Sequence, residues 1–167
     1  MRELLENITI PQSLANSIDA GTLTISDHLL LAAAQFTAAL FPAAETYIGS
    51  QQQAVEAPVL FVDYYSLTNQ KRLAPTSEYE FGLEITYVPA DSLDRRELQN
   101  AIFLIQQNLD RLESDIGAFR CFSKDSDITD GLAHITGIVN VWETEAPDGP
   151  IIEHADQNIT QQGADEN

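Results

Sequence analysis

The sequence has few of the residues that mark several large protein classes. It contains one cysteine, Cys121, in 167 residues, so no disulfide forms within the chain, which fits assembly in a reducing cytoplasm. The longest apolar run, residues 29–34, is interrupted by Gln35 and stopped by Pro42, and it is too short to span a bilayer. The opening residues lack the basic and apolar stretches of a signal peptide. We therefore expect a soluble protein, made inside the cell, with no membrane partner.

Basic residues are also scarce. Eight Lys and Arg residues stand against 26 Asp and Glu residues, which gives a formal charge of -18. Nucleic-acid binding depends on cationic side chains that displace counterions from phosphates, and a surface with this negative charge repels phosphate. The charge has two readings that the sequence leaves open. The negative charge keeps the protein soluble, or it prevents non-specific binding of DNA that passes nearby.

Motifs for catalysis and metal binding are missing from the sequence. The three histidines are His28, His134 and His154, and they form no HExxH pattern; the eight glycines are scattered, and none forms a phosphate-binding loop. A general base needs converging partners, so packing at a surface or interface is the favoured role of His134. For Cys121 a buried thiol is favoured over a nucleophile. We expect a protein that is not an enzyme, with no catalytic residues, no cofactor and no metal.

What the sequence does contain is enough apolar material for one domain. Hydrophobic residues make up 44% of the chain, which is sufficient for a core without disulfides or metals. Residues 1–25 have no clear period and are predicted to be an N-terminal extension whose apolar residues dock on a neighbouring surface. Residues 26–144 are predicted to be the folded domain. Residues 145–167 are acidic, contain no Lys or Arg, and are broken by Pro and Gly; they are predicted to be a flexible tail, with Ile151 and Ile152 as a short docking point.

The first half of the domain predicts one helix and two strands. Ser26 is a suitable N-cap for a helix that ends at Pro42. A short strand is expected at residues 46–48, a loop at 50–53, and a second strand at 59–65 that is buried on both sides at its start.

The clearest periodicity lies in residues 78–87. Tyr79, Phe81, Leu83, Ile85 and Tyr87 alternate with a row that is largely acidic. A period of two predicts a strand with one apolar face against a helical layer and one face toward water or a partner. Within the acidic row, Gly82 is open to two interpretations, close approach by another backbone or a tolerated gap.

The second half predicts a long helix and a hairpin. Asp94 or Ser92 caps the helix, and a capping box is expected between Asp94 and Glu97. The following residues form one apolar stripe on that helix: Leu98, Ile102, Ile105, Leu109 and Leu112. Asp130-Gly131 has the chemistry of a two-residue type I′ turn between two strands. The fold class is therefore α+β, a mainly antiparallel sheet of about five strands with two helices packed on one face.

This order of elements resembles the phage tail terminator family over about residues 26–143. The points of likeness are a helix with a short strand after it, Ala57-Pro58-Val59-Leu60-Phe61-Val62 at the start of the next strand, the alternating strand 78–86, the helix after Pro89, and Asp130-Gly131-Leu132-Ala133-His134 at the closing hairpin. Their order and spacing carry the resemblance, because none of them is a chemical fingerprint.

The resemblance implies a structural virion protein that forms a six-fold ring. Such a ring caps the tail tube, stops its polymerisation and joins it to the head connector; in a contractile tail it also meets the sheath. DNA passes through the ring without specific binding, and the ring is assembled in the bacterial host cytoplasm. Two alternatives stay open at this point: another connector or tail-completion protein of the neck, and a small α+β enzyme or ligand-binding module.

The candidate subunit interface combines the acidic row with the scarce cations. Its members are Lys71, Arg72, Glu78, Glu80, Glu84, Arg95 and Arg96. The glutamates share one face of a strand, where like charges favour a basic partner surface. We expect the cations to bridge to the acidic strand face of the next subunit, which makes ring assembly sensitive to salt. The alternative is that both sets are ordinary solvated charge.

Overall fold

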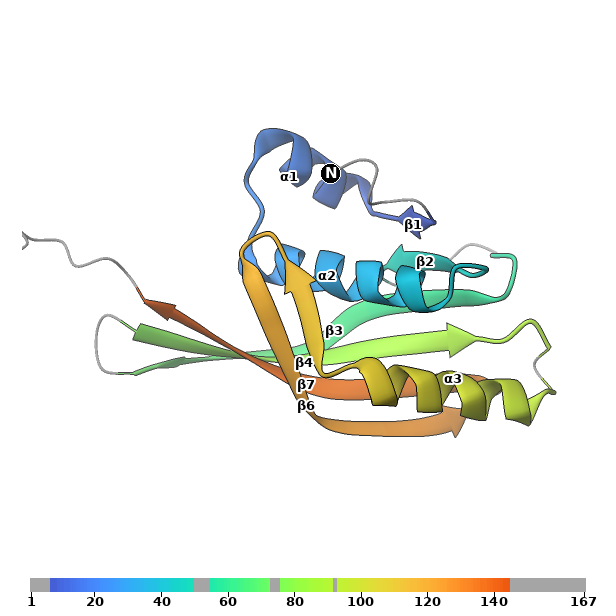
Figure 1. Cartoon of the computed structure of the whole chain (residues 1–167). Coiled ribbons are helices and arrows are strands. Elements are labelled where there is room, and N and C mark those ends of the chain that lie inside the picture. Colours follow the sequence, from blue (N-terminus) through green and yellow to red (C-terminus); the bar gives the residue numbers. More distant parts are fainter. Residues whose placement is uncertain (1–6, 50–54, 73–75, 92, 145–167) are drawn as a thin grey trace, which may run out of the picture.

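The computed structural model describes residues 7–49, 55–72, 76–91 and 93–144. The elements in chain order are β1 (Ile8–Thr9), α1 (Gln12–Ala20), α2 (Ile25–Leu40), β2 (Glu45–Ile48), β3 (Val59–Lys71), β4 (Thr76–Val88), α3 (Arg95–Asn108), β5 (Arg111–Ser114), β6 (Gly117–Thr129) and β7 (Leu132–Thr144). Strands and helices share one core, so the α+β class is confirmed (Figure 1).

The sheet is larger than the sequence predicted. It has seven strands in the order β1-β2-β3-β4-β7-β6-β5, whereas about five were expected. The pairs β1–β2 and β2–β3 are parallel, and the other pairs are antiparallel, so the sheet is mixed and mostly antiparallel. It curls into a half-barrel, since β5 at one edge comes round to contact α2. The extra strands β1 and β5 are two and four residues long, too short to leave a period in the sequence.

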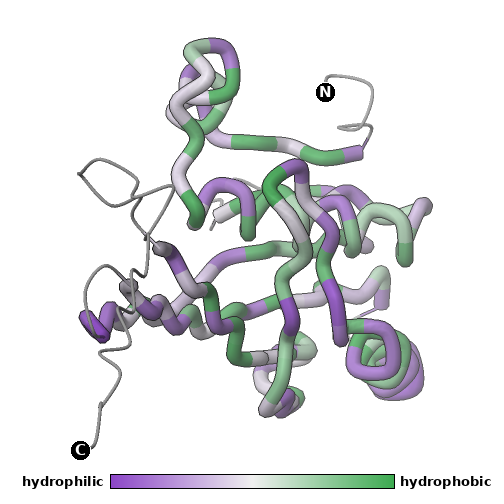
Figure 2. Tube along the Cα trace, turned by 60° about the vertical axis from the view of Figure 1, so that its left-hand side comes forward, coloured by the Kyte–Doolittle hydropathy of each residue, from purple (hydrophilic) through white to green (hydrophobic). Residues whose placement is uncertain are grey.

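Both helices of the predicted helical layer pack on one face of the sheet. Leu29 of α2 and Ile105 of α3 are fully buried against Leu83 and Ile85 of β4 and Ile135 of β7. The alternation predicted for β4 is confirmed, because its apolar residues face this core and its glutamates lie on the other face. Figure 2 shows hydrophobic and hydrophilic residues alternating along the strands.

The N-cap of α2 is Thr24, two residues before the predicted Ser26. The Thr24 Oγ1 accepts a hydrogen bond from the Asp27 backbone N at 3.2 Å, and the Asp27 Oδ2 accepts one from the Thr24 backbone N at 2.8 Å. This reciprocal capping box satisfies two N–H groups that a helix start leaves unpaired.

No single described helix is long and apolar enough to cross a membrane; α1 and α2 meet that test only as a pair bent by 112°.

The start of α3 agrees with the prediction, and its end does not. Asp94 is the N-cap, with its Oδ1 accepting from the backbone N atoms of Arg96 and Glu97. The Glu97 carboxylate does not complete the expected box; it accepts from the Tyr87 hydroxyl at 2.7 Å and ties α3 to β4. The helix ends at Asn108, so Leu112, predicted to be on the helix, lies in β5 and is still buried.

The described part of the N-terminal extension packs on its own chain. Residues 7–25 contain β1 and α1, although no period was visible there. Ile8 and Leu14 are buried with Leu31, Ala34 and Ile48 in a second, smaller core. The earlier apolar residues of the extension, at positions 4 and 5, lie outside the described residues, as do the loop expected at 50–53, the alternative cap at 92 and the acidic tail.

The closing hairpin is as predicted, and it leads into a projecting arm. Asp130 and Gly131 have φ values of 53° and 76°, as a type I′ turn requires. At the far end of the sheet, residues 67–71 of β3, 76–80 of β4 and 140–144 of β7 run past the helices (Figure 1). We call these three segments the arm and the rest of the sheet the body.

Candidate interaction surfaces

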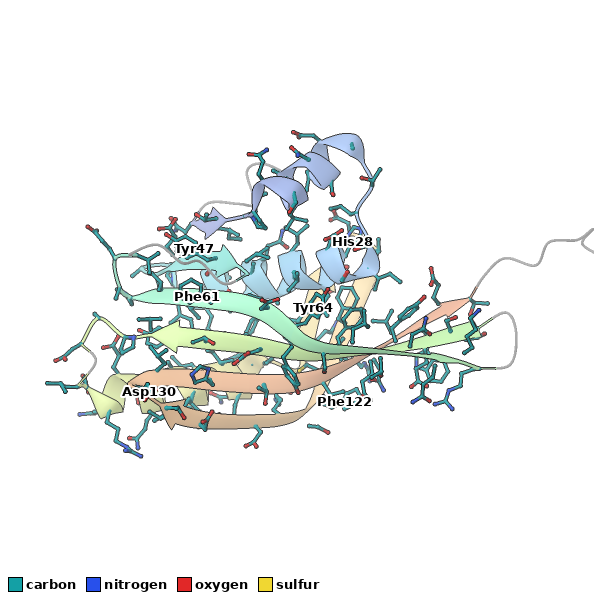
Figure 3. All side chains as sticks on the ribbon, turned by 180° about the vertical axis from the view of Figure 1, so that it is seen from behind. His28, Tyr47, Phe61, Tyr64, Phe122 and Asp130 are labelled. Atoms are coloured by element: carbon teal, nitrogen blue, oxygen red, sulfur yellow. The ribbon has the colours of Figure 1, made fainter. Side chains whose placement is uncertain are left out.

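The outer face of the sheet, opposite α2 and α3, carries the predicted acidic row. Glu80 is exposed, and Glu78 and Glu84 are half-buried. The Glu84 Oε1 lies 3.1 Å from Nδ1 of His134 on β7, and that nitrogen is also 3.3 Å from the Thr86 hydroxyl. Figure 3 views this face and shows no helix in front of the central strands. The row is therefore open to a partner.

Lys71, predicted to be in a loop, is the last residue of β3 at the end of the arm, and Arg72 follows it in the connection to β4. Arg72 forms an ion pair with Glu78 of the neighbouring strand, with Nε 2.8 Å from Oε2, and its guanidinium stands 5.9 Å from the centre of the Trp142 ring. The structure thus brings two of the predicted interface residues together within one chain. Lys71 is exposed and lies in register with Ser77.

Arg95 and Arg96 lie in the first turn of α3, on the helical side of the sheet and away from the glutamate row. Both are exposed, and neither forms an ion pair with another described residue. The same helix presents Phe103 with 64% of its side chain exposed, and Leu93 just before it is 90% exposed. This cation-bearing surface, which we call the α3 face, is separated from the glutamate row by the thickness of the domain.

Sequence reasoning missed the exposed aromatic residues on the outer face. Trp142, Tyr65 and Phe122 are 59%, 56% and 42% exposed, and none of them was singled out from the sequence. Tyr65 lies at an irregularity in the β3–β4 register. Its ring covers Gly82, where an added Cβ would be 2.4 Å from Tyr65 Cζ. The space beside Gly82 is therefore filled by this chain's own side chain.

The other residues considered for chemistry are built into the fold. Cys121 is buried on the core side of β6, and burial raises the pKa of its thiol to about 11, which keeps it protonated near neutral pH. Burial, followed by the hydrogen bond to Glu97, also raises the pKa of the Tyr87 hydroxyl. Among the described residues no three His, Cys, Asp or Glu side chains are grouped to hold a metal.

Two grooves with apolar side chains in their lining lie where the arm leaves the body. One, of about 370 Å³, is lined by Leu23, Ile25, Leu67 and Tyr79 among others. The other, of about 310 Å³, lies between the end of β7 and the β5–β6 turn, and its lining includes Ile116 and Trp142. Both are open, shallow surfaces rather than enclosed cavities, and they suit contact with another polypeptide segment.

Comparison with known protein families gives a match over most of the chain. A family model described as phage tail terminator protein matches residues 24–151. A search of curated proteins found no match to the chain. The matched region begins at the N-cap of α2 and includes the whole sheet except β1.

Proposed function

The chain belongs to the phage tail terminator family, and on that premise we propose that six copies of it close into a ring on the end of the tail tube. Membership makes the protein a tail-terminating structural component of the virion tail. The proposal adds the ring, its contacts and its neighbours.

A ring requires two different surfaces on each subunit that fit each other. In a head-to-tail contact, one surface of a copy binds the other surface of the next copy, and the rotation either closes or continues as a filament. The α3 face presents Arg95 and Arg96, and the outer face presents Glu80 and Glu84, so these two sets of side chains have opposite charge. They lie on opposite sides of the sheet, so a single copy cannot pair one with the other, whereas two copies can.

Apolar contacts supply the area that such a pairing needs. Exposed ion pairs contribute only about 0–1 kcal/mol each, so charge alone does not hold a ring. Phe103 on the α3 face and Tyr65 on the outer face are both more than half exposed. Buried aromatic side chains dominate the energetics of many interfaces. The charges then fix orientation and register.

The neighbours of the ring follow from its place in the tail. We infer that one rim binds the tail tube protein and the other the head-tail connector, with the sheath as a further partner in a contractile tail. DNA passes through the opening, and the charge of -18 disfavours contact with its phosphates. Arg72 already has Glu78 as a partner, so Lys71 is the better candidate of the two for a contact between copies.

The single observation that supports the proposal best is that Arg95 and Arg96 of α3 are exposed and have no ion-pair partner among the described residues of this tail terminator family member. Reversal of both charges, R95E/R96E, is expected to weaken self-association by about tenfold or more at low salt, because two attractive contacts become repulsive. Sedimentation equilibrium measures it. R111E/R120E is the control, since it changes the net charge equally but on strands β5 and β6 instead of helix α3.

Rescue by a charge swap sharpens this test. Combining Arg96→Glu with Glu80→Arg restores opposite charges across the contact, so association is expected to recover relative to Arg96→Glu alone. The proposed contact between the α3 face and the outer face is wrong if R95E/R96E assembles as well as the unaltered chain. It is also wrong if R95E/R96E and the control R111E/R120E lose association equally.

A further inference from the structure

The end of β7 is an open strand edge. On one side β7 pairs with β4 as far as Thr144, which lies opposite Thr76. On the other side its pairing with β6 stops at Val139, opposite Cys121, because residues 117–120 of β6 turn away to pair with β5. Residues 140–144 therefore have no strand on that side among the described residues. Open edges accept extended segments through backbone hydrogen bonds.

The smaller groove lies along this edge. Its lining includes apolar side chains such as Ile116 and Trp142 beside polar surface, and Glu143 is its one charged residue among the described residues. Ile116 of the β5–β6 turn is 56% exposed, and Trp142 is 59% exposed. Asn140, which also lines the groove, has a buried Oδ1 without a hydrogen-bond partner among the described residues. The open edge, the exposed Ile116 and Trp142 side chains and the unsatisfied acceptor together suit a strand that has polar backbone groups and apolar side chains.

The sequence that follows β7 has the composition of a turn and such a strand. It reads Glu145-Ala146-Pro147-Asp148-Gly149-Pro150-Ile151-Ile152. A Pro-Asp-Gly sequence between apolar segments favours a chain reversal. Ile151 and Ile152 are adjacent aliphatic residues in an otherwise polar tail, and the family match extends past the end of β7 to residue 151.

We propose that the chain turns back after Thr144 and adds the segment around Ile151 and Ile152 to the open edge of β7 as an antiparallel strand. The distance is suitable, because the segment starts seven residues after Thr144 and an extended chain covers about 3.3 Å per residue. Adjacent strand residues point to opposite faces. One isoleucine packs in the groove near Ile116, and the other lies on the outer face near Trp142.

The proposed strand makes the tail a cover for an interaction surface. An uncovered edge beside exposed apolar residues is a template for strands of other chains. With the tail in place, copies meet through their faces rather than through the β7 edge. This inference does not depend on the ring, because it concerns a contact within one chain.

The test uses Trp142, the one tryptophan of the sequence, as a probe in the groove. The full-length variant I151S/I152S is compared with the matched control Ile159→Ser, which removes the other isoleucine of the tail. The double variant is expected to red-shift the Trp142 emission and raise its acrylamide quenching. Backbone amides of residues 140–144 are expected to exchange about tenfold faster or more. The control is expected to match the unaltered chain in all three readouts.

Two further measurements test the tail contact: a variant of the groove and the dependence of amide protection on protein concentration. Ile116→Ser, at an exposed position of the groove, is expected to reproduce part of the loss, and the protection in the unaltered chain is expected to be independent of concentration. Unchanged emission and exchange in I151S/I152S would overturn the proposal. Protection that appears only as copies associate would also overturn it, because a second copy would then occupy the edge. Association itself is recorded separately by sedimentation, so loss of the ring and loss of the tail contact are distinguishable.

Discussion

The body and the arm are parts of the same sheet, yet they are built differently. In the body, β3 begins with Val59, Leu60 and Val62, all fully buried, whereas every residue of β3 in the arm is exposed. The same contrast holds along β7, where Ile135 is fully buried and Trp142 is more than half exposed. The body has helices on one face and provides stability. The arm extends past the helices, carries more exposed side chains and offers surface for recognition.

The largest expected effect comes from removing core volume in the body. Ile135→Ala is expected to lower the free energy of unfolding by about 2–5 kcal/mol, because it leaves a cavity among tightly packed side chains. Leu67→Ala in the arm is the matched comparison, and it is expected to cost less than about 1 kcal/mol because Leu67 is 46% exposed. Urea denaturation measures both. Equal losses would contradict the division into body and arm.

Adding volume in the body is expected to have the next largest effect. A Cβ on Gly137 would lie 2.3 Å from the buried Sγ of Cys121, so Gly137→Ala is expected to destabilise the protein by about 1–3 kcal/mol through overpacking. Thermal unfolding measures it. Cys121→Ala removes the obstructing sulfur, and in the Gly137→Ala background it is expected to recover part of the loss. No recovery would show that the strain arises elsewhere.

The capping box of α2, where the body meets the arm, gives a smaller effect. Thr24→Ala removes the acceptor for the Asp27 backbone N and is expected to cost about 1 kcal/mol. Ser26→Ala is the control, since the sequence favoured Ser26 as the cap and the structure places it inside the helix. A larger loss from Ser26→Ala in urea denaturation would reverse this assignment.

The smallest effect is expected at Arg72, which directly follows the arm segment of β3. Arg72→Ala removes the ion pair with Glu78 and the contact with Trp142, and it is expected to cost about 0.5 kcal/mol or less, because the Arg72 side chain is 51% exposed. The change in Trp142 emission is the sensitive readout. A loss in urea denaturation as large as that of Thr24→Ala would show that the arm contributes to stability.

The sequence predicted those elements whose signal is local. Alternation in β4 and the turn at Asp130 and Gly131 are readable because each depends on neighbouring residues. The strands β1 and β5 were missed because two and four residues are too few to leave a period in the sequence. Leu112 fitted a helical stripe and was buried as expected, but it is buried from a strand, because a period cannot show where a helix stops.

The candidate site was predictable in its residue types and not in its pairings. The scarcity of cations drew attention to Arg72, Arg95 and Arg96, and the alternation placed the glutamates on one face. Which cation already has a partner depends on the register of β3 and β4, which sets Arg72 beside Glu78. Exposure of Trp142 depends on β6 leaving β7 at Val139. Neither the pairing of Arg72 with Glu78 nor the exposure of Trp142 can be predicted from neighbouring residues in the sequence.

The most direct test of the ring is native mass spectrometry of the unaltered chain, alone and mixed with the tail tube protein. The account predicts a closed homo-oligomer of six copies that persists in the mixture and binds to the end of tube assemblies. Raising the ionic strength is expected to shift the population toward smaller species. A chain that stays monomeric at every salt concentration, with and without the tube protein, would contradict the account.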